Sequence, residues 1–71
     1  MPRPIPTRRI IRVLQEKGFF FVSQRGSHAK FRREGDPSLT VIVPMHGNEI
    51  PHGTFRSILR QAQLEEGDFV A

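Results

Sequence analysis

Two segments of the chain carry apolar residues at the spacing of a helix that buries one face. The first is residues 8–17, with a stripe formed by Ile10, Val13 and Leu14. Thr7 stands just before this segment, where the hydroxyl of an N-cap is favoured. Gly18 follows it, where a residue in the left-handed conformation often ends a helix. The pattern therefore predicts a first helix that runs from Arg8 to Lys17.

The second helical segment follows a predicted loop, Pro44–His52, and starts between Pro51 and Thr54. Its apolar positions follow the i, i+3, i+4, i+7 pattern and are Phe55, Ile58, Leu59 and Ala62. The outer face carries Arg56 and Arg60, whose like charges four residues apart weaken an isolated helix slightly. A phosphate or an acidic partner would offset this repulsion, and screening by solvent is the simpler alternative.

Three short segments between the helices have the composition of strands. Phe19–Ser23 is a run of aromatic and β-branched residues, which predicts a strand buried on at least one face. Ser38–Val43 alternates so that one face receives Leu39, Val41 and Val43. The turns at Gln24–Gly26 and Glu34–Pro37 contain Gly, Pro and Asp. Sequential strands joined by short turns indicate an antiparallel meander.

The middle strand, Ser27–Arg33, alternates between apolar and basic positions. One face receives small or apolar residues and the other receives polar ones: Ser27, Ala29 and Phe31 against His28, Lys30 and Arg32. Two helices can cover the apolar face, and a small antiparallel sheet can leave its other face open. The sequence thus predicts an α+β fold, with two helices on one face of a three-stranded antiparallel sheet and a histidine on the other face.

The chain of 71 residues fits one small domain that spans residues 1–71. Residues 1–6 alternate with proline and should be extended, whereas residues 65–71 form a short acidic tail, either a last turn or a loose end. Six Phe and no Trp or Tyr mean that Phe must supply much of the core. The lack of Cys agrees with a cytoplasmic location, and no apolar run approaches the roughly 20 residues of a membrane span.

The formal net charge is +4, from 11 Lys and Arg against 7 Asp and Glu. All of the basic residues except Lys17 and Lys30 are Arg, which suits bidentate contact with phosphate. A basic domain of this size indicates nucleic acid as the first candidate partner and an acidic protein as the second. The Phe19–Phe21 run would stack on bases if a ring were exposed. Because large apolar residues are few, we assign this run to the core.

The residues around His28 suit cleavage of RNA without a metal ion. RNA supplies its own nucleophile, because the 2′-hydroxyl attacks the adjacent phosphorus once a base takes its proton and cations stabilise the developing charge. His28 is the candidate proton carrier, and the candidate phosphate contacts are Arg25, Ser27, Lys30 and Arg32. DNA lacks the 2′-hydroxyl and would be spared. On these residues alone, a catalytic histidine and an inert exposed histidine are both open interpretations.

No other enzyme signature accompanies this set. The chain has no Gly-rich phosphate loop and no HExxH motif, and His28, His46 and His52 are spaced like no standard metal site. We therefore expect neither a metal nor a cofactor. His46 is a candidate accessory proton carrier if its loop folds beside the strand, and a role as a polar loop residue is the alternative for both His46 and His52.

Four stretches together resemble the HicA toxins, also called YcfA-like proteins. They lie in the family's order and spacing between about Pro6 and Leu64, and they are Gly18-Phe19, Gln24-Arg25-Gly26-Ser27-His28, Val43-Pro44-Met45-His46 and Pro51-His52-Gly53-Thr54-Phe55-Arg56-Ser57-Ile58-Leu59-Arg60-Gln61-Ala62. Two positions depart from the family's pattern. Phe31 stands where many relatives carry Tyr, and Gln63 stands where the usual residue after the second helix is Gly.

The resemblance implies a fold like the double-stranded-RNA-binding domain, α-β-β-β-α. It also implies a toxin of a type II toxin–antitoxin pair that cleaves messenger RNA, with a HicB-type antitoxin that covers the active site. The family's catalytic histidine falls on His28, and Arg56 and Arg60 would flank the site for RNA or antitoxin. Two alternatives remain beside this hypothesis: an RNA-binding module without catalysis, and a basic surface that docks only an acidic protein.

Overall fold

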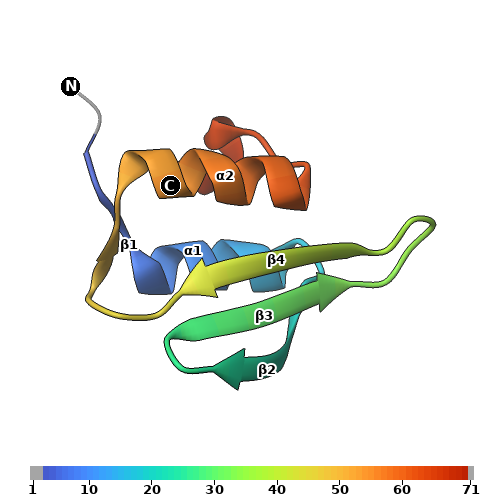
Figure 1. Cartoon of the computed structure of the whole chain (residues 1–71). Helices are drawn as coiled ribbons and strands as arrows, with labels where there is room; N and C mark the ends of the chain where they lie inside the picture. The colour runs from blue at the N-terminus through green and yellow to red at the C-terminus, as the bar shows by residue number, and fades with distance from the viewer. Residues whose placement is uncertain (1–2, 71) are drawn as a thin grey trace.

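The computed structural model describes residues 3–70. Its elements are β1 (Ile5–Pro6), α1 (Thr7–Glu16), β2 (Phe20–Arg25), β3 (His28–Arg33), β4 (Leu39–Pro44), β5 (Glu49–Ile50), α2 (His52–Ala62) and the 3₁₀ turn η1 (Glu66–Phe69). Figure 1 shows both helices on one side of the sheet formed by β2, β3 and β4. The predicted α+β fold is therefore confirmed. No helix within residues 3–70 is long and apolar enough to cross a membrane.

The main sheet is an antiparallel meander in the order β2-β3-β4, as predicted. β2 and β3 are joined by a two-residue turn in which Gly26 takes φ 58°, a conformation that favours glycine. Ser27, predicted to begin the middle strand, lies in this turn instead. The amide of Met45 donates to the carbonyl of Ser27, so the pairing of β3 with β4 continues one step beyond the strands.

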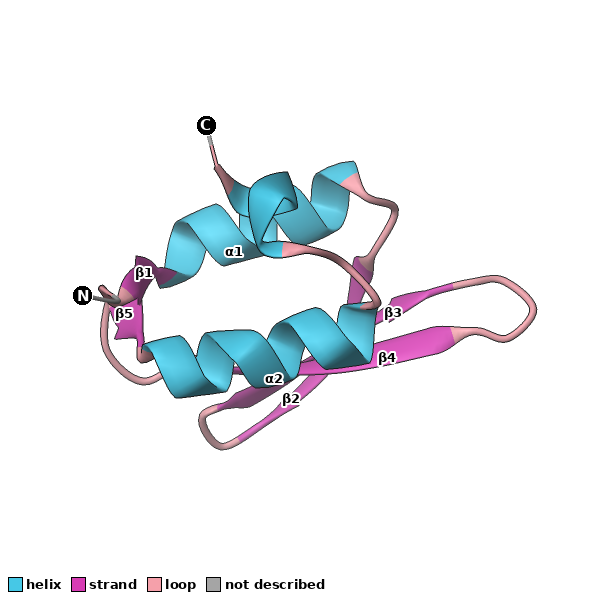
Figure 2. Ribbon diagram, turned by 90° about the horizontal axis from the view of Figure 1, so that it is seen from above, coloured by secondary structure: helices cyan, strands magenta, loops and turns pink. Residues whose placement is uncertain are grey.

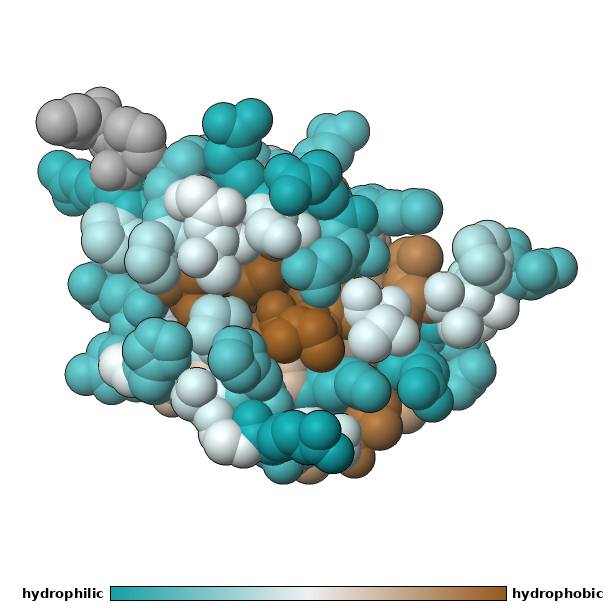
Figure 3. All heavy atoms as spheres, viewed as in Figure 1, coloured by the Kyte–Doolittle hydropathy of each residue, from teal (hydrophilic) through white to brown (hydrophobic). Residues whose placement is uncertain are grey.

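The core lies between the covered face of the sheet and the two helices. Its buried residues include the whole α1 stripe, most of the α2 stripe and the apolar face of the sheet: Ile10, Val13, Leu14, Ala29, Phe31, Val41, Val43, Phe55, Ile58 and Ala62. Leu39 and Leu59 are partly buried against this cluster. Both helical stripes and the alternation of the middle strand are thus confirmed. In Figure 3 apolar side chains form a strip between α2 and β4, framed by hydrophilic ones.

The end of α1 follows the prediction for Gly18. This glycine takes φ 95°, its amide donates to the carbonyl of Gln15 (3.1 Å), and the amide of Phe19 donates to the carbonyl of Leu14 (2.9 Å). The two bonds form a Schellman motif, which satisfies carbonyls that the helix leaves without partners. Phe19 is buried directly after the turn, and it anchors the chain before β2 begins.

The start of α1 differs from the prediction, because Thr7 is the first helical residue and Pro6 is the N-cap. The Thr7 amide donates to the carbonyl of Asn48 (2.9 Å), while its hydroxyl is buried and has no hydrogen-bond partner within residues 3–70. The physical reason is a pairing that the sequence did not reveal. β1 pairs with β5, with Ile5 opposite Ile50, so a second small sheet holds the chain in place as it enters the helix.

That pairing also corrects the prediction of a plain loop over Pro44–His52, since β5 occupies part of it. The extended start is confirmed for the described residues 3–6, while residues 1 and 2 lie outside them. α2 starts at His52, within the predicted interval.

Of the two alternatives for the acidic tail, the last turn is correct for residues 65–70, since η1 lies within them. Phe69 is buried, and its ring meets the ring of Phe55 edge-on at 5.1 Å. The Asp68 carboxylate accepts the backbone amide of Glu65 (2.8 Å) and pairs with the ammonium of Lys17 (3.3 Å). These contacts, the backbone hydrogen bond first, lower the pKa of Asp68. The tail therefore closes the core next to α1; residue 71 lies outside the described chain.

The prediction that the Phe19–Phe21 run belongs to the core is confirmed for Phe19 and wrong for Phe20 and Phe21. Phe20, Phe21 and Val22 are 45%, 54% and 38% exposed, and every residue of β2 is exposed. β2 is an edge strand, so only β3 flanks it. The pairing also shifts by one residue between Phe21 and Ser23, which makes Val22 the extra residue of a β-bulge.

Candidate active site

Pairing within the main sheet sets which side chains share its open face, because directly paired residues of antiparallel strands point to the same side. Three rows of three residues form this face, each centred on β3: Arg25–His28–Pro44, Ser23–Lys30–Ile42 and Phe20–Arg32–Thr40. These nine positions carry a histidine and three cations, and none of them is a carboxylate. The open face is therefore positive along its whole length.

His28 is the first residue of β3, directly after the turn, and its side chain is exposed on the open face. Hydrogen-bonded strands on both sides of β3 hold its backbone, since Arg25 pairs with it from β2 and Pro44 from β4. The Cβ atoms of such directly opposite residues lie about 5 Å apart. The guanidinium of Arg25 can consequently reach a phosphate that also contacts the imidazole of His28.

Lys30 and Arg32 follow His28 along β3 on the same face, and both are half-buried. At a rise of about 3.3 Å per residue, they stand about 7 and 13 Å further along β3. Within residues 3–70 the ion pair found is Lys17–Asp68, so no carboxylate there neutralises Arg25, Lys30 or Arg32. The three cations can therefore bind an anion that follows the strand. The alternation that placed His28, Lys30 and Arg32 on one face is confirmed.

Two other sequence candidates lie at the His28 end of the sheet. Ser27 is half-buried in the turn, and its carbonyl is bonded to the amide of Met45. His46 is exposed in the loop that follows β4, two residues beyond Pro44, the pairing partner of His28. The fold thus brings the loop of His46 to the same end of the sheet as His28. No group of three or more His, Cys, Asp or Glu residues that could hold a metal ion occurs in the part of the chain described here.

Arg56 and Arg60 are not brought to His28. Both are exposed on α2, which covers the opposite face of the sheet, and Figure 2 shows α2 in front of the strands in that view. The sheet therefore separates these two arginines from the open face. His52, the first residue of α2, is half-buried, with its ring 6.0 Å from that of Phe55. It packs at the edge of the core, as a polar residue at a helix start.

A second basic cluster was missed by the sequence analysis. Arg8, Arg9 and Arg12 are exposed at the start of α1 and line, with Pro6, a hollow of about 410 Å³. The positive end of the helix dipole adds to their charge, and the first turn of α1 contains no acidic residue that would offset it. The spacing of Arg8 and Arg12, four residues apart on a helix, was the signal that could have revealed the cluster.

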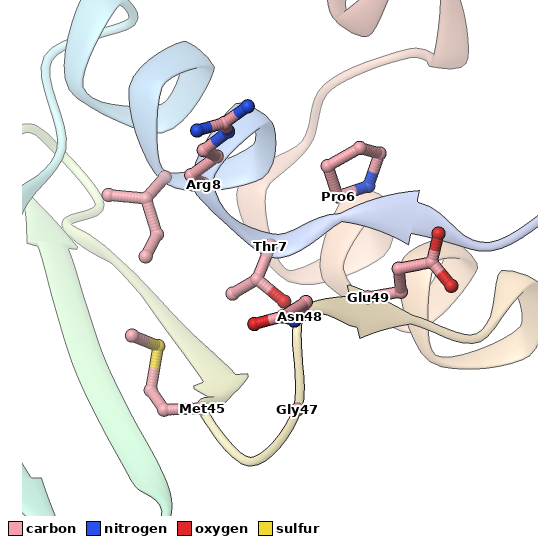
Figure 4. A pocket seen from close by; sticks show the side chains of 8 residues that line it. Pro6, Thr7, Arg8, Met45, Gly47, Asn48 and Glu49 are labelled. Atoms are coloured by element: carbon pink, nitrogen blue, oxygen red, sulfur yellow. The ribbon is translucent and has the colours of Figure 1, made fainter.

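A larger hollow, of about 600 Å³, separates this cluster from the loop after β4. Figure 4 shows that Thr7 and Arg8 line it from α1, while Met45 and Asn48 line it from the loop. Since Met45 is also bonded to the turn before His28, the hollow borders the His28 end of the sheet. A long polyanion could contact both basic regions across this loop.

Comparison with models of known protein families identifies the family of this chain. Residues 7–64 match the family described as the HicA toxin of bacterial toxin-antitoxin. The matched segment starts at the first residue of α1, includes the whole main sheet and ends two residues after α2. No curated protein matches the chain. The family indicated by the sequence resemblance is thereby confirmed.

Proposed function

The chain belongs to the HicA toxin family of bacterial toxin–antitoxin systems, and from that premise we propose that it is an endoribonuclease that cleaves messenger RNA in the cytoplasm without a metal ion. The observation that carries the proposal is the composition of the open sheet face. An exposed histidine stands on the central strand among Arg25, Lys30 and Arg32, and no carboxylate shares the face. Histidine can carry protons near neutral pH, and the cations suit a phosphodiester.

In the proposed reaction the 2′-hydroxyl of the RNA attacks the adjacent phosphorus. His28 takes the hydroxyl proton, the bond between phosphorus and the 5′-oxygen breaks, and that oxygen leaves with a proton from the imidazolium or from water. Arg25 and Lys30 stabilise the negative charge that develops on the phosphoryl oxygens. The products are a 2′,3′-cyclic phosphate, which water can open to a 3′-phosphate, and a 5′-hydroxyl. DNA has no equivalent nucleophile and is not cleaved.

The family implies an antitoxin as the partner, and we infer that it is a HicB-type protein that covers the open face. An acidic surface on that partner would complement the three cations, and it would exclude RNA from His28. The exposed Arg56 and Arg60 on α2 offer a separate surface for either partner. A reading frame for such a protein next to this gene would support the assignment.

Substitution of His28 tests the proposal most directly. We expect His28→Ala to lower the rate of RNA cleavage about 100- to 10,000-fold, the usual contribution of general acid–base catalysis. Induced expression of the parent chain should stop growth and degrade messenger RNA, and His28→Ala should do neither. His52→Gln is the matched control, because it removes a histidine that lies away from the open face, and it should stay toxic. Equal toxicity or equal harmlessness of the parent and His28→Ala would refute the catalytic assignment.

A second candidate function is RNA binding without catalysis. It is favoured by the arginines of α1 and α2, which can contact phosphates but lie away from His28. It predicts binding that weakens with salt in proportion to the number of phosphate contacts, and no cleavage. Cleavage that persists in EDTA and disappears in His28→Ala would exclude this candidate.

A further inference from the structure

Two neighbouring phenylalanines of β2 lie on opposite faces of the sheet. Phe21 pairs with Phe31, and their rings meet edge-on at 5.8 Å on the side of the helices. Phe20 pairs with Arg32 and therefore lies on the open face, where 45% of it is exposed. No aromatic partner for the Phe20 ring is found among residues 3–70. The core thus explains the position of Phe21 and leaves that of Phe20 unexplained.

The β-bulge at Val22 determines which residues Phe20 accompanies. In a regular strand Phe20 and Arg25, five positions apart, would point to opposite faces. The extra residue restores them to the same face, with Phe20 beside Arg32 and Arg25 beside His28. Bulges often redirect side chains beside functional sites. The open face consequently carries an aromatic ring beside Arg32 at one end and the histidine beside Arg25 at the other, with Lys30 between them.

This combination fits nucleic acid. Proteins that bind single-stranded nucleic acid combine a positively charged track for the backbone with aromatic rings on which bases stack. The open face has Arg25, Lys30 and Arg32 as the track, and it has no carboxylate that would repel phosphate. An acidic protein would complement the same charges, but only a nucleotide brings both a flat base for the ring of Phe20 and a phosphate for the guanidinium of Arg32 beside it.

We propose that Phe20 stacks on an unpaired base of the RNA substrate while Arg32 contacts the phosphate beside that base. The inference rests on the proposed function and names its substrate class, RNA that is single-stranded where it crosses β2. Arg32 stands about 13 Å along β3 from His28, at about 3.3 Å per residue. The stacked base therefore belongs to a nucleotide away from the cleaved bond. Its face must be free of neighbouring bases, which a continuous duplex does not allow.

Binding of a short fluorescent oligouridylate, measured by anisotropy, tests the inference. The binding measurements use the His28→Ala chain so that the RNA stays intact. Addition of Phe20→Ala should weaken binding about 5- to 150-fold, the range measured for loss of one stacked base. Phe20→Trp should retain the affinity. Phe21→Ala is the matched control, because it removes a neighbouring exposed ring from the other face, and it should change the affinity less than about twofold. Circular dichroism melts establish that each variant is folded.

Three outcomes would overturn the inference. Equal affinity of the Phe20→Ala chain and its parent for the oligouridylate would show that no base stacks there, and equal losses for Phe20→Ala and Phe21→Ala would show a general effect on the edge strand. Loss of antitoxin affinity with RNA affinity retained would make Phe20 a protein contact. In each case cleavage by the chain with native His28 could persist. A native chain that neither binds nor cleaves RNA would instead refute the proposed function itself.

Discussion

β2 and β4 are the two edges of the same sheet, yet their environments are opposite. On β4, Val41 and Val43 are fully buried, and the side chain of Gln61 from α2 accepts the backbone amide of Ile42 (2.8 Å) on the outer side of the strand. A helix therefore covers that edge. All six residues of β2 are exposed, and the bulge at Val22 interrupts its pairing.

The difference shows that in this small domain one edge strand contributes to stability while the other is available for binding. An edge strand presents unpaired backbone groups, and proteins protect such edges with helices, charges or bulges. β4 is protected by α2 and contributes to stability, whereas β2 has only its bulge and the charge of Arg25. Since β2 contributes little to the core, its side chains are available for binding. The same strand carries Phe20 and Arg25 of the proposed RNA surface.

Matched substitutions of valine should give the largest difference in stability between the two edge strands. Val41→Ala removes buried methyl groups from the covered edge, and we expect it to lower the free energy of unfolding by about 2 kcal/mol. Val22→Ala makes the same chemical change on the exposed edge, and we expect less than about 0.5 kcal/mol. Urea unfolding measures both values. Similar losses for the two variants would mean that β2 is packed as tightly as β4, and the division of roles would be wrong.

The sequence predicted the central strand better than either edge. β3 has a neighbour on each side and a single covered face, so its period of two survives and places His28 opposite the core. The prediction that the aromatic run reaching into β2 belongs to the core failed for Phe20 and Phe21 for two reasons. The order of strands in a sheet is not a local property, and the extra residue at Val22 changes which face each neighbour joins.

Local sequence patterns also could not predict the pairings between segments that are distant in the chain. Ile5 meets Ile50 across most of the chain, so β1, β5 and the unusual start at Thr7 had no local signal. Phe69 is a single apolar residue in an acidic tail, and no periodicity marks it as core. Of the candidate site, the alternation of β3 predicted the face on which His28 lies, whereas the proposal that His28 is catalytic came from the family resemblance. The separation of Arg56 from that face could not be predicted locally, because it depends on α2 packing against the opposite face of the sheet.

The hydrogen bond to the covered edge offers a second, smaller test. Gln61→Ala leaves the Ile42 amide without its partner, and we expect it to lower the free energy of unfolding by about 1 kcal/mol because the site is only partly buried. The Ile42 amide should also exchange with solvent faster. Gln24→Ala is the matched control on β2, where the side chain donates to the Gly26 carbonyl in full exposure, and it should change stability by less than about 0.5 kcal/mol. Unchanged exchange at Ile42 in Gln61→Ala would show that α2 does not protect this edge.

The C-terminal ends of the two helices give the test with the smallest expected effect. The end of α1 leads into the β2 edge, and α2 covers the β4 edge. α1 ends at Glu16, and Gly18 completes the turn that leads toward β2, whereas α2 ends at Ala62 and is followed by its C-cap Gln63 at φ 56°. The amides of Gln63 and Leu64 donate to carbonyls of the last turn, the pattern that Gly18 completes in α1. Glycine relieves the strain of a positive φ but also loosens the unfolded chain, so we expect Gln63→Gly to raise the free energy of unfolding by only about 0.5 kcal/mol.

Gln63→Ala retains a side chain at this position and should leave stability unchanged, which separates the backbone effect from the loss of the amide group. Protection of the Ile42 amide should rise with Gln63→Gly if the end of α2 limits how firmly the helix holds β4. A gain in stability without that protection would place the strain in the helix end alone. A loss of stability would mean that the Gln63 side chain stabilises the helix end by more than its backbone strain costs, and the covered edge would then depend on a residue that departs from the family's usual glycine.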